Sequence, residues 1–340
     1  MCEDDSFDDL VAYRLRLEQL SRRGFGAFSL ASLLPVGCKS ADGAAAPADS
    51  PAGAAPGATI ATTESDVSIT TPDGVCDAYF VHPSSGRSPA VILWPDIFGL
   101  RPAFQQMAKR LAASGYAVLV VNPFYRTKKA PTAAPRADFE DKATREGLMA
   151  LAGSLTAETA TTDAKALTAW LDQQGSVDRD RKMGTAGYCM GGPIVFRTAA
   201  ANPERIGAAA TFHGGGLVSD KPDSPHLLIP RTKARYLIAI AGNDDAKQPE
   251  AKGTLKAAFA QASLPAKVEV YEAAKHGWCP PDSHVYDRDL AEKAWGELVA
   301  LLKESLGLGD EALIHTVGEW ARGRGDAVPP CSPLAEQGGN

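Results

Sequence analysis

The sequence lacks the signatures of several common protein classes. Its six cysteines contain no Cys-x-x-Cys pair, and their wide spacing over 340 residues argues against both a zinc-binding module and a disulfide scaffold. The formal net charge is −6, and no stripe of lysine and arginine interrupts the chain. Nucleic acid is therefore not expected as a partner. No internal repeat is evident.

A long hydrophobic run is also missing near the start of the chain. The weakly apolar segment Gly26–Gly37 is shorter than the about 20 residues that a membrane-spanning helix needs. Arg22-Arg23 precede it, and this arrangement resembles a bacterial twin-arginine export signal. We therefore expect residues 1–38 to direct export to the periplasm; the alternative is a surface helix of a cytoplasmic protein. The segment ending at Cys38 is similar to a lipoprotein cleavage box, although Pro35 is unusual there, so a membrane tether through lipidated Cys38 is a second alternative.

Composition divides the rest of the chain into three parts. Residues 39–63 are rich in alanine, proline and glycine, which predicts a disordered linker. Residues 64–306 alternate apolar strands with helical stretches and are expected to form the catalytic domain. Residues 307–340 form a C-terminal extension that begins at a glycine-rich break.

The apolar pattern predicts an α/β fold. Strands are expected at Asp66–Thr70, Cys76–Val81, Ala90–Trp94, Ala117–Asn122, Lys182–Tyr188, Ala208–His213, Tyr236–Ala241 and Lys267–Tyr271. Helices are expected at Ala103–Ser114, Phe139–Ala152, Ala157–Gln173, Gly191–Ala201, Glu250–Ala262 and Asp287–Leu306. The later strands are continuous apolar runs, which is typical of a mostly parallel central sheet flanked by helices. The first two strands, on either side of Pro72-Asp73-Gly74, predict an antiparallel hairpin.

A glycine-rich run indicates the nucleophile. Gly187-Tyr188-Cys189-Met190-Gly191 reads Gly-x-Cys-x-Gly between a strand and a helix, which is the nucleophile-elbow pattern with cysteine in the usual place of serine. The glycines leave room for the sharp turn. The spacing does not match the dinucleotide-binding pattern Gly-x-Gly-x-x-Gly. We therefore predict Cys189 as a thiol nucleophile.

The partners of this thiol follow in the expected chain order of nucleophile, acid and histidine. Asp244 and Asp245 follow one later strand and His276 follows the last one. His276 is expected to move the proton, and a carboxylate to orient its ring. Both aspartates are candidates, and the Gly-x-x-Asp spacing favours Asp245. We expect the backbone N–H groups of Met190 and Ile97 to form the oxyanion hole.

These residues together resemble the dienelactone hydrolase family over roughly Glu64 to Leu306. The resemblance is carried by Trp94–Leu100, Asn122–Arg126, the Cys189 elbow, Asp245 and His276-Gly277-Trp278. It implies an α/β-hydrolase fold, a Cys-His-Asp triad, no metal or organic cofactor, and hydrolysis of a small-molecule ester or lactone through an acyl-cysteine. His213-Gly214-Gly215-Gly216 is similar to the oxyanion motif of lipases but follows the wrong strand, so we interpret it as a structural turn.

Two departures from the family pattern concern activation and substrate. Asp96 stands where the family's best-studied branch has a glutamate that helps to generate the thiolate, and its reach is one methylene shorter. Pro280 stands where members that bind a lactone carboxylate have an arginine four residues after the catalytic histidine. Arg126 or Arg101 could supply that charge or could be a solvated surface residue. Tyr125 and Trp278 are candidates for a pocket wall or for ordinary core packing.

Two other classes of function stay open at this point. A thiol redox protein would use a pair of cysteines, and the candidate partner of Cys189 is Cys279, which lies three residues after His276. A non-catalytic binding protein on a hydrolase fold is also conceivable, because a fold alone does not imply an activity. An intact triad argues against the second class. Oligomeric state and the identity of the substrate do not follow from the sequence.

Overall fold

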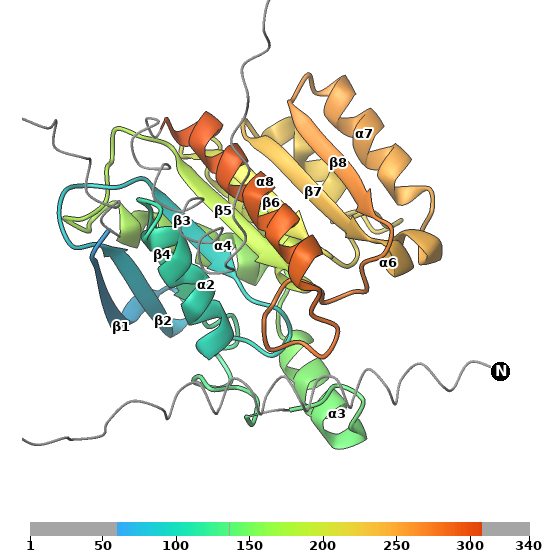
Figure 1. Cartoon of the computed structure of the whole chain (residues 1–340), viewed down its shortest axis with the longest axis horizontal. Coiled ribbons are helices and arrows are strands. Elements are labelled where there is room, and N and C mark those ends of the chain that lie inside the picture. Colours follow the sequence, from blue (N-terminus) through green and yellow to red (C-terminus); the bar gives the residue numbers. More distant parts are fainter. Residues whose placement is uncertain (1–59, 136, 308–340) are drawn as a thin grey trace, which may run out of the picture.

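Eight strands form one mixed sheet in the computed structural model, which describes residues 60–135 and 137–307 (Figure 1). In chain order the strands are β1 (Thr62–Thr71), β2 (Gly74–Pro83), β3 (Ala90–Trp94), β4 (Ala117–Val121), β5 (Met183–Tyr188), β6 (Ile206–Phe212), β7 (Arg235–Ala241) and β8 (Ala266–Tyr271). Their order in the sheet is β1-β2-β4-β3-β5-β6-β7-β8. β1 and β2 form the antiparallel hairpin, β2 is antiparallel to β4, and all further neighbours are parallel. The predicted mostly parallel sheet with an N-terminal hairpin is confirmed.

Helices cover both faces of this sheet. One face packs against α2 (Pro102–Ala112) and α8 (Arg288–Leu306), which cross the front of the sheet in Figure 1. The other face packs against α4 (Ala157–Leu171), α5 (Gly191–Ala201) and α7 (Ala251–Gln261). Every residue of β3 and β4 is buried, and alternate side chains enter the two hydrophobic clusters. Burial on both faces explains why these strands are continuous apolar runs rather than alternating ones.

Local signals in the sequence define the helix ends. Thr156 and Thr159 form a capping box at the start of α4, and the Asp287 carboxylate accepts the Leu290 N–H at the start of α8. α8 ends at Gly307, whose φ of 70° is the left-handed conformation that favours glycine. These caps satisfy backbone groups that would otherwise lack partners at the helix ends.

Most predicted elements occur within a few residues of their expected bounds, and four differences are informative. β1 begins at Thr62, before the expected start of the catalytic domain at Glu64. α3 (Lys142–Ala152) starts later than expected because the Asp141 side chain caps it. Two short helices were not predicted, namely the 3₁₀ helix η1 (Pro225–Arg231) and α6 (Gly242–Lys247). The second of these carries both candidate aspartates, which matters for the active site.

Several predictions fall on residues that the structure does not describe. The export signal 1–38, with Arg22, Arg23 and Cys38, lies outside the described residues, as do the linker up to residue 59 and the extension from residue 308. Among residues 60–135 and 137–307, no helix is long and apolar enough to cross a membrane.

Candidate active site

The turn between β5 and α5 holds Cys189 in a strained backbone conformation. Its φ is 52°, which lies in the left-handed region that residues with a β-carbon rarely adopt. The two flanking glycines are required by close backbone packing. A Cβ at Gly187 would lie 2.3 Å from the Gly191 carbonyl oxygen, and a Cβ at Gly191 would lie 2.4 Å from that of Trp94. The predicted elbow at Cys189 is thus confirmed as a backbone geometry.

His276 follows β8 and connects Cys189 to a carboxylate. Its Nδ1 lies 2.7 Å from Oδ2 of Asp244, and its side chain also forms a hydrogen bond with Cys189. Its backbone N–H donates to Oδ1 of Asn243 at 2.9 Å. Burial lowers the pKa of His276, but the hydrogen bonds to Asp244 and Cys189 and the charges of both outweigh burial and raise the pKa to about 10. These contacts favour the protonated form of the ring.

The structure corrects the expected choice between the two aspartates. Asp244, and not Asp245, contacts the His276 ring, whereas Oδ2 of Asp245 accepts a hydrogen bond from Lys252 Nζ at 2.5 Å. The Gly-x-x-Asp residues form the short helix α6, which is not predicted from the sequence. Adjacent residues of a helix point about 100° apart, so only one of the two carboxylates can face the histidine. Gly242 allows the start of α6 to lie close to the chain that follows β8, because a Cβ there would lie 2.1 Å from the Glu272 carbonyl oxygen.

A second histidine lies at the same site, where the sequence suggested only a structural turn. His213 directly follows β6, has a φ of 43°, and is 1% exposed. Its ring centroid is 5.0 Å from that of His276, and neither of its ring nitrogens has a hydrogen-bond partner among the described residues. Burial, together with the neighbouring His276, lowers the pKa of His213 well below its ordinary value, so this imidazole is neutral.

Three potential metal ligands meet here. The donor atoms of Cys189, His213 and His276 all lie within 4.8 Å of one another. Two sequence signals concerned His213, namely its position after a strand of the parallel sheet and its place in a run similar to the oxyanion motif of lipases. The glycines after it do form a turn against α5, since a Cβ at Gly214 would lie 3.3 Å from Cα of Gly192.

The loop after β3 packs directly against the elbow. A Cβ at Gly191 would also lie 2.9 Å from the Pro95 carbonyl oxygen. Met190 is the N-cap residue of α5, and Ile97 belongs to the β3 loop that approaches it. The two predicted oxyanion donors therefore come from segments that are in contact.

Asp96, a candidate either for activating the thiol or for supporting the site, forms an ion pair with Arg101. Arg101 donates from Nη1 and Nη2 to its two carboxylate oxygens, at 2.6 and 2.9 Å, and also binds Asp282 through Nε at 2.7 Å. Burial lowers the pKa of Arg101, but the two carboxylates outweigh burial and raise it above its ordinary value. The Phe98 N–H donates to Asp96 as well. The geometry thus assigns Asp96 to anchoring the β3 loop.

The predicted substrate-binding residues Tyr125 and Arg126 have partners elsewhere. The Tyr125 hydroxyl donates to Oδ1 of Asp163 on α4 at 2.7 Å and also contacts the Thr71 hydroxyl. Arg126 binds the same Asp163 and also Asp73, in the turn between β1 and β2. These contacts join the hairpin, β4 and α4. The contacts among the described residues therefore place Tyr125 and Arg126 in a structural cluster with Asp163, and their role in substrate binding stays a prediction.

Trp278 is a core residue and not a pocket wall. It is fully buried, and its ring lies 5.1 Å from the His213 ring and 5.2 Å from the Tyr271 ring. A residue without exposed surface cannot contact a substrate in this conformation. The Trp278 ring instead packs against the His213 ring.

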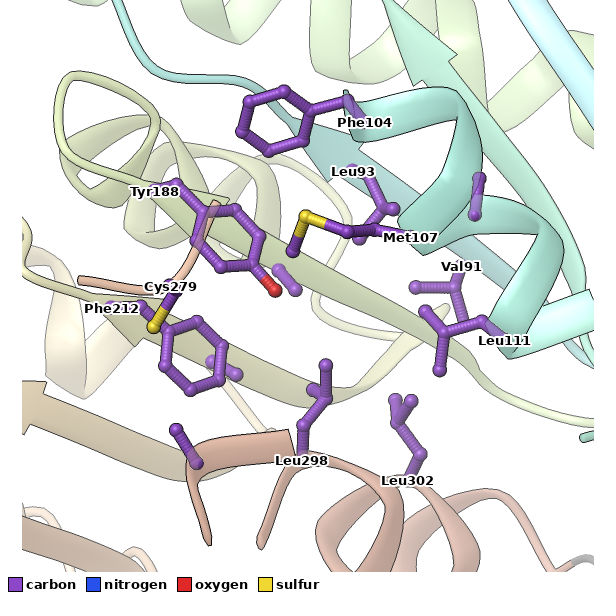
Figure 2. Packing of buried hydrophobic residues seen from close by; sticks show 14 of the residues in the cluster. Val91, Leu93, Phe104, Met107, Leu111, Tyr188, Phe212, Cys279, Leu298 and Leu302 are labelled. Atoms are coloured by element: carbon purple, nitrogen blue, oxygen red, sulfur yellow. The ribbon is translucent and has the colours of Figure 1, made fainter. Parts of the chain in front are cut away.

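Cys279 lies in the hydrophobic core and not among the donor atoms of the Cys189 site. Figure 2 shows its sulfur beside Tyr188 and Phe212, in the hydrophobic cluster beneath α2 and α8. This region contains a cavity of about 180 Å³ that Cys279 and Tyr188 line. Burial raises the pKa of the Cys279 thiol well above its ordinary value, so the thiol is neutral and a poor partner for disulfide exchange. Cys189 and Cys279 are both free thiols in the structure.

Comparison with known proteins places this site in a family. The model of the dienelactone hydrolase family matches residues 76–306, which is well over half of the chain. The chain belongs to the dienelactone hydrolase family. Its membership, together with its similarity to carboxymethylenebutenolidases, identifies it as a hydrolase of the ester and lactone class.

Individual relatives agree with this assignment. A protein of Escherichia coli strain K12, provisionally named a carboxymethylenebutenolidase, is 28% identical over 233 residues, which cover 67% of this chain and 82% of the relative. The carboxymethylenebutenolidase of Rhodococcus opacus is 26% identical over 202 residues, 58% of this chain and 74% of its own. A structure from Klebsiella pneumoniae, provisionally titled a dienelactone hydrolase, has a TM-score of 0.62 at 21% identity and covers 72% of this chain and 99% of that one. The last likeness confirms the α/β-hydrolase fold.

Proposed function

We propose that this family member hydrolyses a carboxylic ester or lactone through an acyl-cysteine on Cys189. The observation that carries the proposal is the continuous chain of contacts from Cys189 to His276 to Asp244, built on a strained elbow. Each member follows a different parallel strand, so the three side chains converge at one edge of the sheet. Such an arrangement places beside the thiol the base that a nucleophilic cysteine needs.

In the first half of the reaction, the thiolate of Cys189 attacks the carbonyl carbon and forms a carbon–sulfur bond. The negative charge moves to the carbonyl oxygen, where the N–H groups of Met190 and Ile97 are proposed to stabilise it. Collapse of this intermediate breaks the bond to the leaving oxygen, which takes the proton of the His276 imidazolium. An acyl-cysteine and a neutral His276 remain.

In the second half, water hydrolyses the acyl-cysteine. The neutral His276 accepts a proton from the attacking water, the carbon–sulfur bond breaks, and the acid leaves together with a regenerated thiolate–imidazolium pair. Asp244 keeps the ring oriented in both halves and stabilises its protonated form. It is a positioning residue, because it touches the histidine and not the reacting atoms.

We further propose that the preferred substrate carries no carboxylate beside the scissile bond. Pro280 occupies the position at which carboxylate-binding members have an arginine. The two arginines considered as replacements are both held by aspartates, Arg101 by Asp96 and Asp282, and Arg126 by Asp73 and Asp163. A pair of aryl esters with the same leaving group, one neutral and one bearing a carboxylate, tests this. A higher kcat/KM for the anionic ester would contradict the proposal.

The catalytic proposal is tested with a panel of aryl esters and lactones on wild type, Cys189→Ala and Cys279→Ala. We expect Cys189→Ala to lose hydrolysis and Cys279→Ala to keep it. Rapid quenching of the wild type with a slow ester should add the acyl mass to the peptide that contains Cys189. Full hydrolytic activity in Cys189→Ala would refute the acyl-cysteine, and loss of activity only in Cys279→Ala would favour the dithiol alternative.

Export remains a separate proposal that rests on the sequence alone. Arg22-Arg23 before a short apolar segment support periplasmic targeting, and Cys38 supports a possible lipid anchor. Changing Arg22-Arg23 to Lys-Lys should leave unprocessed precursor in the cytoplasm. Processing that is unchanged in this variant would contradict twin-arginine export, and absence of lipid label on Cys38 would contradict the anchor.

A further inference from the structure

Cys189, His213 and His276 form a cluster of soft donors that ester hydrolysis does not fully explain. The thiol and one imidazole have roles in the proposed reaction, but the second imidazole has none. All three donor atoms lie within 4.8 Å of one another, and they come from the ends of β5, β6 and β8. Thiolate and imidazole are the ligands that zinc and related ions prefer in proteins.

His213 is the observation that calls for a ligand. It is 1% exposed and lies within 4.8 Å of the other two donors, yet both of its ring nitrogens lack a hydrogen-bond partner among the described residues. Buried polar groups are nearly always paired, so two orphaned nitrogens on one side chain are unusual. The backbone N–H of His213 is satisfied by the Ala239 carbonyl oxygen at 2.9 Å, so the deficit belongs to the ring alone.

We propose that Cys189, His213 and His276 bind a zinc ion as a reversible inhibitor of the hydrolase. Nδ1 of His276 is occupied by Asp244, which leaves Nε2 for the metal. A carboxylate on the far nitrogen of a ligating histidine is a common support in zinc sites. Three protein ligands with a fourth position open to water match the pattern of accessible zinc sites rather than of closed structural ones.

Binding requires only a modest rearrangement. Zinc–sulfur bonds of about 2.3 Å and zinc–nitrogen bonds of about 2.0–2.1 Å place tetrahedral donors about 3.3–3.6 Å apart. The three donors lie no more than 4.8 Å apart, so each pair has to approach by at most about 1.5 Å to reach this spacing. The hydrogen bond between Cys189 and His276 is replaced by one zinc–sulfur and one zinc–nitrogen bond, His213 adds a second zinc–nitrogen bond, and the proton shared by the pair is released to solvent. No electron is transferred.

The consequence for activity rests on the proposed function. A zinc ion on the Cys189 sulfur removes the nucleophile, and the same ion on His276 removes the proton carrier. Hydrolysis should therefore stop while the metal is bound and return when a chelator removes it. The affinity itself does not depend on the reaction and can be measured without a substrate.

The test uses the untagged full chain, reduced and stripped of metal, titrated with zinc chloride in competition with a chromogenic chelator. We expect a zinc site that is lost in Cys189→Ala and weakened at least tenfold in His213→Asn. Asparagine tolerates the left-handed backbone at this position, and His213→Phe serves as a second variant that keeps an aromatic ring. Cys279→Ala and the exposed His284→Ala remove a thiol and an imidazole elsewhere and should leave the affinity unchanged. Circular dichroism checks that each variant is folded.

Protection of the thiol gives a readout that is independent of activity. Zinc should slow alkylation of Cys189 by iodoacetamide in the wild type and not in His213→Asn, as measured on the tryptic peptide. Wild-type affinity in both His213 variants would overturn the proposal, as would equal alkylation with and without zinc. If zinc protects Cys189 but Cys189→Ala still hydrolyses esters, the zinc site stands and the acyl-cysteine proposal fails. If Cys189→Ala is inactive and zinc does not bind the wild type, the acyl-cysteine proposal stands and the zinc site fails.

Discussion

His213 and His276 have ring centroids 5.0 Å apart at the ends of β6 and β8, yet their pKa values shift in opposite directions. His276 meets Asp244 and Cys189, and these partners raise its pKa to about 10 despite burial. His213 packs against aromatic rings, and its ring nitrogens have no hydrogen-bond partner within the part of the chain that the structure describes, so burial dominates and its pKa falls. The comparison teaches that a carboxylate and a thiol facing an imidazole can outweigh partial burial, whereas full burial among aromatic rings favours the neutral form.

The largest expected effect on activity is that of removing the His276 ring. His276→Ala should lower kcat/KM for an aryl ester by about 10³- to 10⁴-fold, because the variant lacks both the activator of the thiol and the donor to the leaving group. The exposed His284, eight residues further along, provides the control, and His284→Ala should match wild type. Steady-state rates in the presence of a chelator measure both. A loss of less than tenfold in His276→Ala would assign the proton transfers to another group.

The second largest effect on activity is expected when the carboxylate partner of His276 is replaced and the imidazole ring is kept. Asp244→Asn should lower kcat/KM by about 10²- to 10³-fold, because an amide does not stabilise the imidazolium. Its neighbour provides a matched control, since Asp245→Asn removes only the contact with Lys252. Asp245→Asn should stay within about twofold of wild type, as expected for a partly exposed ion pair. Equal losses in the two variants would contradict the assignment of Asp244.

The contrast between these aspartates also shows what could be predicted from the sequence. Cys189 was predictable because the elbow depends on adjacent residues, the glycines at positions 187 and 191. His276 was predictable because it follows the last strand. The choice of Asp244 was not, because it depends on the rotational phase of the short helix α6, which the loop-like sequence Gly242-Asn243-Asp244-Asp245 does not disclose.

Long-range pairing accounts for the other differences. Arg126 binds Asp163, and Arg101 binds Asp282, which lies 181 residues away. Nothing near either arginine in the sequence distinguishes a paired from a free guanidinium. The role of His213 is not predictable for the same reason, because its proximity to His276 arises only when β6 and β8 take their places in the sheet. The fold, which depends on repeated local patterns, was predictable to within a few residues at most element ends.

A smaller effect concerns the pH dependence of the reaction. The reaction needs the His276 imidazolium, so kcat/KM should decline as pH rises through about 10. Asp244→Asn removes a cause of the raised pKa, and the alkaline decline should then begin at lower pH. The residual activity of this variant is measured with an ester whose spontaneous hydrolysis is subtracted at each pH. An alkaline limb at the same pH in both proteins would show that Asp244 does not hold the proton on His276.

The smallest effect follows from His213 and concerns stability. The unfolded chain binds a proton at this histidine below about pH 6.5, whereas the native state keeps it neutral, so stability is present above this pH and falls as pH decreases. Below pH 6.5, this difference lowers the free energy of unfolding by up to about 1.4 kcal/mol for each pH unit. His276 acts with the opposite sign, since its raised pKa contributes stability below about pH 6.5 that is lost as pH rises through about 10.

Urea unfolding of wild type and His213→Asn between pH 7.5 and 5.5 isolates the contribution of His213, because groups common to both proteins largely cancel. The stability difference between the two proteins should shift in favour of the variant as pH falls, and parallel curves would mean that the native state protonates His213.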